Sequence, residues 1–146
     1  METDELTNAP PVIDTFVNVN MGSTERPEWL VRVAEDYFKR APQIFKDIQA
    51  DALIERMDEL GVRKSIITMR ALETDARILA FPERYPDRFS LSISCDPRAG
   101  MKTVSALESL VRNHPVSLAR LVPFMTGLAA NEAPCYPLFS KCCELD

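Results

Sequence analysis

Four segments of the chain are rich in apolar and β-branched residues over lengths typical of β-strands. They cover residues 12–19, 65–69, 89–95 and 118–124. The first is apolar on both faces, which predicts a buried strand, and the third alternates apolar with small polar residues at the two-residue period of a strand. Pro10 and Pro11 bar regular structure before the first segment. We therefore expect residues 1–11 to be a disordered tail and residues 12–146 to be the folded part.

Helical periodicity fills the intervals between these strands. Amphipathic helices are expected at residues 50–60, 74–84 and 100–113, and a fourth begins in residues 136–146. The interval 21–49 is longer and carries a helical pattern of its own, interrupted by Pro27 and Pro42. It predicts a long helical loop after strand one, a kind of excursion that often forms a lid or a wall.

The strand and helix segments alternate four times, and helical crossovers imply parallel strands. Two folds accept this order, an open doubly wound sheet and a barrel. The dinucleotide-binding form of the open sheet needs a glycine-rich turn after strand one, where only Gly22 is found. A complete barrel uses eight strands and about 250 residues. The expected fold class is therefore α/β, as half of a (β/α)8 TIM barrel with four βα units.

Composition and charge exclude several classes of protein. Hydrophobic residues make up 46% and charged residues 27% of the 146 residues, which is typical of soluble globular proteins. The net charge is -5 and the basic residues are scattered, so nucleic acid is not an expected partner. No apolar stretch approaches the roughly 20 residues of a membrane helix, and the acidic start lacks the features of a signal peptide. We expect a cytoplasmic protein without a membrane partner, and its four cysteines, which form no Cys-x-x-Cys pair, are expected to be reduced.

Short motifs along the chain resemble one enzyme family in their order and spacing. Ile13-Asp14-Thr15-Phe16-Val17-Asn18 occupies the place of an Ile-Asp-x-His-x-His motif at the end of a first barrel strand. The further motifs are Leu60-Gly61-Val62, Tyr85-Pro86-Asp87-Arg88-Phe89, Asp96-Pro97-Arg98, Tyr136-Pro137-Leu138-Phe139 and Cys143-Glu144-Leu145. From Val12 onward the chain resembles the N-terminal half of the amidohydrolase-related family, whose members are metal-dependent barrel hydrolases and decarboxylases.

The resemblance implies a site at the carboxyl ends of the strands that acts on small or aromatic acids, esters or amides. The two histidines of the first metal motif are replaced by Phe16 and Asn18. Phe16 cannot coordinate a metal, and the amide oxygen of Asn18 is a weak ligand for a transition metal. We expect no metal on these residues and no cofactor in this segment. A divalent metal such as Zn²⁺ is expected only in a full-length parent, with ligands from strands beyond Asp146.

Three polar residues at strand ends are the candidates for binding a small-molecule substrate. Asp96 ends strand three, where barrel enzymes place their sites, and could act as a base or orient substrate; the alternative is a turn or cap residue before Pro97. Asn18 and Asn20 end strand one and could hydrogen-bond a ligand or satisfy loop backbone. The single histidine, His114, follows a helix at the opposite end of the barrel, so no catalytic residue is identified beyond the candidate Asp96.

Three hypotheses about function remain open at the level of sequence. In the first, a full-length parent is a hydrolase or decarboxylase for a small or aromatic acid, ester or amide, and this chain alone is inactive. In the second, the chain is a catalytically inactive half-barrel that acts by association, because its two outer strand edges are unpaired and favour a homo-oligomer. In the third, the chain binds a small molecule without chemistry.

Overall fold

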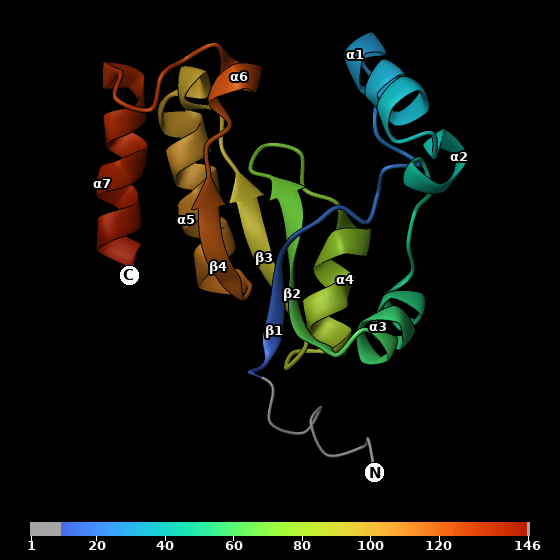
Figure 1. Cartoon of the computed structure of the whole chain (residues 1–146). Coiled ribbons are helices and arrows are strands. Elements are labelled where there is room, and N and C mark those ends of the chain that lie inside the picture. Colours follow the sequence, from blue (N-terminus) through green and yellow to red (C-terminus); the bar gives the residue numbers. More distant parts are fainter. Residues whose placement is uncertain (1–9, 146) are drawn as a thin grey trace.

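The computed structural model describes residues 10–145 and contains a four-stranded sheet flanked by helices (Figure 1). The strands are β1 (Val12–Val17), β2 (Val62–Arg70), β3 (Phe89–Ser94) and β4 (Val116–Arg120). They lie in the order β1-β2-β3-β4, and each neighbouring pair is parallel. The predicted alternation of strands and helices and the parallel sheet are confirmed. Most of the predicted tail, residues 1–9, lies outside the described residues.

Helices connect the strands and close the chain. The α-helices are α1 (Glu28–Arg32), α2 (Ala41–Ile44), α3 (Ala50–Glu59), α4 (Ala76–Arg84), α5 (Met101–Asn113), α6 (Pro123–Thr126) and α7 (Tyr136–Leu145). Shorter π and 3-10 turns are η2 (Val33–Tyr37), η3 (Pro97–Ala99) and η4 (Ala133–Cys135). No helix within residues 10–145 is long and apolar enough to cross a membrane. The long loop between β1 and α3 is helical, as its sequence pattern predicts.

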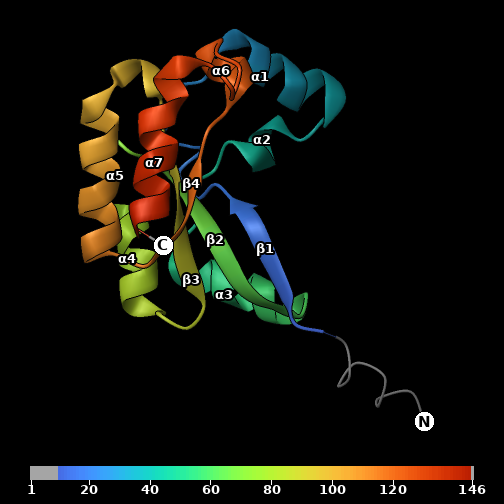
Figure 2. The ribbon, with the colours of Figure 1, turned by 90° about the vertical axis from the view of Figure 1, so that its left-hand side faces the viewer.

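The strand order favours one of the two candidate architectures. Right-handed crossovers between sequential neighbours place the connecting helices on one face of the sheet, whereas a doubly wound sheet reverses its order and covers both faces. Seen from the side of β4, helices α4, α5 and α7 lie on the same side of the strands (Figure 2). The arrangement is consistent with a partial (β/α) barrel.

The hydrophobic core fills the layer between the sheet and these helices. Alternate residues of β2 and β3 point into it and are at most 2% exposed, namely Ile67, Met69, Phe89, Leu91 and Ile93. They pack with helix residues such as Met57, Ile78, Phe81 and Leu107. The alternation of apolar residues and serines in β3 therefore gives the strand two different faces, as predicted. Its apolar residues face the helices and its serines face the other way.

Strand β1 was predicted to be buried, but the structure shows it exposed. Val12, Ile13 and Phe16 are 52%, 51% and 58% exposed. The reason is its position at the edge of the sheet, where it has one neighbouring strand and where its inner face is uncovered within the described residues. An apolar pattern on both faces indicates what a strand can bury, but not which part of the molecule covers it.

Strand β4 is shifted from the predicted 118–124 to Val116–Arg120. The strand ends before Pro123 because proline has no N–H to donate, and Pro123 instead begins the short helix α6. This earlier end places Arg120 at the carboxyl edge of the sheet.

Candidate functional site

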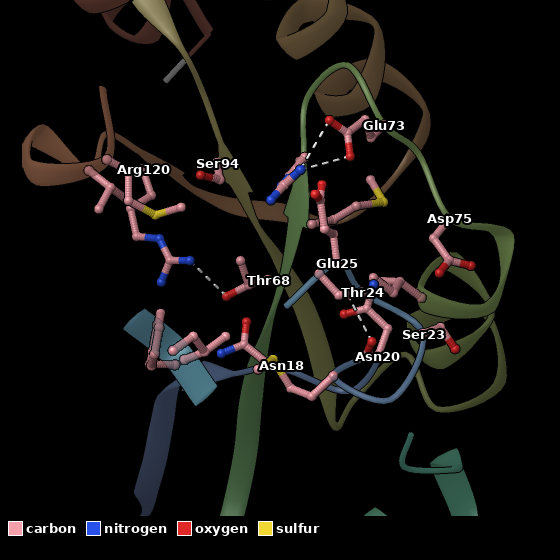
Figure 3. A pocket seen from close by; sticks show the side chains of 18 of the residues that line it. Asn18, Asn20, Ser23, Thr24, Glu25, Thr68, Glu73, Asp75, Ser94 and Arg120 are labelled. Carbon is pink, nitrogen blue, oxygen red and sulfur yellow. Dashed lines mark hydrogen bonds and ion pairs between the residues drawn. The ribbon is translucent and has the colours of Figure 1, made fainter. Parts of the chain in front are cut away.

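A cavity of about 1050 Å³ lies at the carboxyl ends of the strands (Figure 3). Each strand contributes a polar residue at this edge, in the order Asn18, Thr68, Ser94 and Arg120. The outer walls come from the long loop after β1 and from the segment after β4. The predicted binding residues Asn18 and Asn20 both line this cavity, as expected for side chains that follow the end of β1.

Arg120 reaches across the concave face of the sheet. Its Nη2 donates to Thr68 Oγ1 at 3.2 Å, and its Cζ lies 4.3 Å from the ring centroid of Phe16. Its Nε is buried and has no hydrogen-bond partner within the described part of the chain. Burial lowers the pKa of Arg120. Arginine side chains nevertheless stay charged in proteins. The cavity wall thus contains a partly desolvated guanidinium with a free donor.

The other cations of the cavity wall are paired. Arg70 Nη1 lies 2.9 and 3.1 Å from the two carboxylate oxygens of Glu73. Arg77 Nη2 is 2.7 Å from Asp75 Oδ2 and its Nη1 is 3.2 Å from Asp47 Oδ2. No carboxylate of residues 10–145 lies within 4.0 Å of the Arg120 guanidinium nitrogens, so the positive charge of Arg120 is not neutralised.

Neutral hydrogen-bonding groups surround the Arg120 guanidinium. Thr68 and Ser94 contribute hydroxyls and Asn18 contributes an amide (Figure 3). Ser92, which pairs in register with Thr68, has a buried hydroxyl oxygen without a hydrogen-bond partner among the described residues. A cation with a free N–H beside several hydroxyls is an arrangement that recognises a carboxylate, since each carboxylate oxygen accepts more than one hydrogen bond.

A polar cluster anchors the long loop to the start of α4. The Ser23 backbone N–H donates to Asp47 Oδ1 at 3.0 Å and the Ser23 hydroxyl donates to the same carboxylate, which also pairs with Arg77. These hydrogen bonds hold the pKa of Asp47 below its usual value, and the hydrogen bond from the Ser23 hydroxyl has the largest effect. Gly22 is needed for this approach, because a Cβ there would lie 2.9 Å from Asp47 backbone N and Oδ1. This wall of the cavity is thereby fixed to the start of α4.

Two aromatic residues meet at the outer wall of the cavity. Trp29 of α1 and Phe124 of α6 form an edge-to-face pair with centroids 6.2 Å apart at an interplanar angle of 87°. Both line the cavity, although their segments are separated by most of the sequence. Their contact joins the two loops that follow the edge strands β1 and β4.

Asp96 lies in a different place from the two asparagines. It lines a smaller adjoining pocket of about 300 Å³ and accepts hydrogen bonds from the Arg98 backbone N–H at 3.0 Å and from the Arg98 guanidinium at 2.7 Å. The hydrogen bonds from Arg98 lower the pKa of Asp96. These contacts are those of a cap on the turn Pro97–Ala99, the alternative stated for this residue. Its role as a base or binding group stays a prediction.

The residues near the altered metal motif do not fit a metal ion. Within residues 10–145 no three His, Cys, Asp or Glu side chains gather closely enough to hold one. The Phe16 ring instead packs against Arg120, and Asn18 presents an amide to the cavity. We therefore derive no chemical step through a metal from these residues, and ligands from a longer parent stay a prediction.

The comparisons with known proteins show similarity of fold. No protein-family profile matches the chain, and no curated protein does. Among solved structures, the chain is similar to a probable 2-pyrone-4,6-dicarboxylic acid hydrolase from Acinetobacter baumannii with citric acid bound, with 16% sequence identity and a TM-score of 0.59. The match covers 93% of this chain and 47% of the hydrolase chain, so the chain spans about half the length of that protein.

Proposed function

We propose that this chain forms half of a (β/α)8 TIM barrel distantly related to the amidohydrolase-related hydrolases, and that its cavity binds a small organic acid through Arg120. The observation that carries the proposal is the guanidinium of Arg120 in the cavity wall. Its Nε is buried and has no hydrogen-bond partner among residues 10–145, whereas Arg70 and Arg77 are held by carboxylates.

A carboxylate in this cavity would pair with the Arg120 guanidinium, and a small rotation of that side chain would bring its buried Nε–H within reach of the ligand. A bidentate pair uses two parallel N–H groups, and hydrogen bonds between charged groups contribute about 1.5–3 kcal/mol each. The hydroxyls of Thr68 and Ser94 can donate to the remaining lone pairs. Because the guanidinium is already partly desolvated, part of the cost of removing it from water is met before the ligand binds.

The structurally similar hydrolase supports an acid as the ligand class. That protein is described as acting on a dicarboxylic acid, and its structure contains bound citric acid. Both ligands carry several carboxylates on a small framework, and the cavity of about 1050 Å³ in this chain is large enough for molecules of that size.

The proposal is tested by calorimetric titration of the chain with citrate and with 2-pyrone-4,6-dicarboxylate. We expect Arg120→Met to weaken binding roughly 10- to 150-fold, which corresponds to the loss of about 1.5–3 kcal/mol. Arg70→Met is the matched control, because it removes a cation from the same wall that Glu73 already neutralises. If both variants bind as the parent does, or if both lose binding equally, Arg120 is not the acid-binding group.

Hydrolysis by a full-length parent is the second candidate function, favoured by the similarity to a hydrolase. We expect the chain of residues 1–146 to bind the lactone 2-pyrone-4,6-dicarboxylate without opening its ring, since Asp96 is the candidate base and its carboxylate is occupied by Arg98. The measurement is the absorbance of the lactone over time in the presence of the purified chain. Turnover that disappears in Asp96→Asn would favour the enzyme hypothesis over simple binding.

A further inference from the structure

We propose that a second copy of this chain covers the concave inner face of the sheet, pairing β4 of each copy with β1 of the other to close an eight-stranded barrel. The inference goes beyond acid binding, because it concerns the face and edges of the sheet below the cavity. It rests on the exposure of that face, the state of the two edge strands, the accessible area of the chain and the curvature of the sheet.

The inner face carries exposed apolar side chains on both edge strands and is uncovered within the described part of the chain. Ile13, Phe16 and Leu118 are 51%, 58% and 43% exposed. The helices that bury the opposite face lie on the other side of the strands (Figure 2). Exposed large hydrophobic residues on the uncovered face of a sheet are typical of a surface that another protein covers.

The edge strands carry little of the protection that isolated sheets usually have. Neither outer edge is paired within residues 10–145. Neither Val12–Val17 nor Val116–Arg120 contains a proline, and each contains a single charged residue, Asp14 and Arg120 respectively. Monomeric proteins block such edges with prolines, inward charges or a covering element. Both edges are therefore suited to pairing with another strand.

The accessible area of the chain agrees with a missing interface. The chain exposes 9986 Å². A compact monomer of the mass of residues 10–146 exposes roughly 7,200 Å², and the nine preceding residues could add at most about 1,500 Å² even when fully extended. About 1,300 Å² of exposure remains beyond that of a compact monomer. A stable interface buries about 800 Å² on each partner, so the surplus is sufficient for one.

A second copy fits these edges because the sheet supplies half of the strands that a closed barrel requires. Eight parallel strands close a barrel of this class, and residues 10–145 form four in sequential order. The sheet is already strongly curved, since Arg120 on β4 contacts Phe16 on β1 across the two intervening strands. A two-fold axis along the barrel would form two identical seams between β4 and β1, which is the closed symmetry that most homodimers have.

Closure of the barrel would also complete the cavity. In each seam the carboxyl end of β1 from one copy, with its Asn18 and Asn20, would lie beside the Arg120 of the other copy. Leu118 and Ile13 would be enclosed in the barrel interior. Lys64, the inner-face charge near the amino end of β2, would lie towards the opposite rim, where a long side chain can reach water.

The first test is the mass of the purified chain by light scattering at micromolar concentration. We expect twice the 16.5 kDa of one chain. A species of 16.5 kDa would overturn the proposal, and so would an open series of larger species, because a closed barrel admits two copies only.

Two variants test the face and the seam. Leu118→Glu places a charge in the closed interior and should convert the dimer to a monomer, while Leu60→Glu, at a 58% exposed position that follows α3, is the control and should remain dimeric. The Arg120 carbonyl accepts a hydrogen bond from the Cys95 N–H of the β3 side, so the backbone groups of the preceding residue, Ala119, point to the open edge of β4. Ala119→Pro therefore removes an N–H from that edge. We expect it to lose the dimer while circular dichroism shows retained helix content.

The outcomes of these variants separate the seam from other contacts. A dimer that resists Ala119→Pro but is lost in Leu118→Glu would show face-to-face packing of two sheets and would overturn the proposed seam. A dimer that resists both variants would place the contact elsewhere on the molecule. Because neither variant changes Arg120, Arg70 or Glu73, the result is distinguishable from a failure of acid binding.

Discussion

Replacement of Arg120 by methionine should remove acid binding without unfolding the protein. In the parent, the buried Nε of Arg120 has no hydrogen-bond partner among residues 10–145, which costs about 1–3 kcal/mol. The variant loses the hydrogen bond to Thr68, worth about 1 kcal/mol, and the cation–π contact with the exposed Phe16 ring, worth about 0.5–1 kcal/mol. Methionine keeps an unbranched apolar chain and can contact the same ring. We expect the free energy of unfolding to change by less than about 1 kcal/mol.

The assay is urea unfolding of both proteins at the same protein concentration, because self-association would make stability depend on concentration. Thr68→Val, alone and combined with Arg120→Met, provides the control. Thr68→Val should destabilise the parent by about 1 kcal/mol by removing an acceptor of the guanidinium, and should have little effect in the Arg120→Met background. If Arg120→Met lowered the free energy of unfolding by more than about 2 kcal/mol, the guanidinium would stabilise the fold, and the expectation of a small change would be wrong.

Three further predictions follow from the described contacts. Leu107→Ala, at a core position only 1% exposed, should lower the free energy of unfolding by about 2–5 kcal/mol in urea unfolding, and an effect below about 1 kcal/mol would place Leu107 outside the core. The hydrogen bonds from Arg98 lower the folded-state pKa of Asp96, so they stabilise the fold above the unfolded pKa of about 3.9, and this stability is lost as the pH falls through the lower folded value. Relative to Asp96→Asn, which keeps a capping oxygen, the parent should therefore lose stability faster on acidification, and parallel curves would contradict this. Citrate should change the fluorescence of Trp29, the only tryptophan, because Trp29 and Phe124 line the cavity, and a signal in the parent that persists unchanged in Arg120→Met would contradict binding at this site.

Much of the fold follows from local pattern. Helix α3 was predicted at residues 50–60 and runs over Ala50–Glu59, because its apolar period and the glycine after it are both local signals. The end of β4 was predicted too late because the apolar run continues past Arg120, whereas Pro123 already belongs to a helix. The exposure of β1 could not be predicted, since burial of an edge strand depends on what lies beside it in space.

The candidate site was predicted in part. The position of Asn18 and Asn20 at the cavity could be predicted because polar residues after a parallel strand gather at one edge of the sheet, and their role in binding stays a prediction. Arg120 was missed, since the predicted strand placed it in the middle of residues 118–124, where a single arginine is typical of a solvated face. Its importance comes from tertiary contacts, namely the desolvation of its guanidinium and the pairing of Arg70 with Glu73. The sequence signal that could have found it is a lone charge within an otherwise apolar strand segment.

The most direct test of acid binding at Arg120 is the NMR signal of its side-chain Nε–H during titration with citrate. We expect a large, saturable shift of this resonance, with the Nε–H signal of Arg70 little changed because Glu73 already holds that guanidinium. Arg120→Met identifies the resonance by removing it. Saturable binding of citrate that leaves the Arg120 Nε–H signal unmoved, or no binding at all, would contradict the central claim.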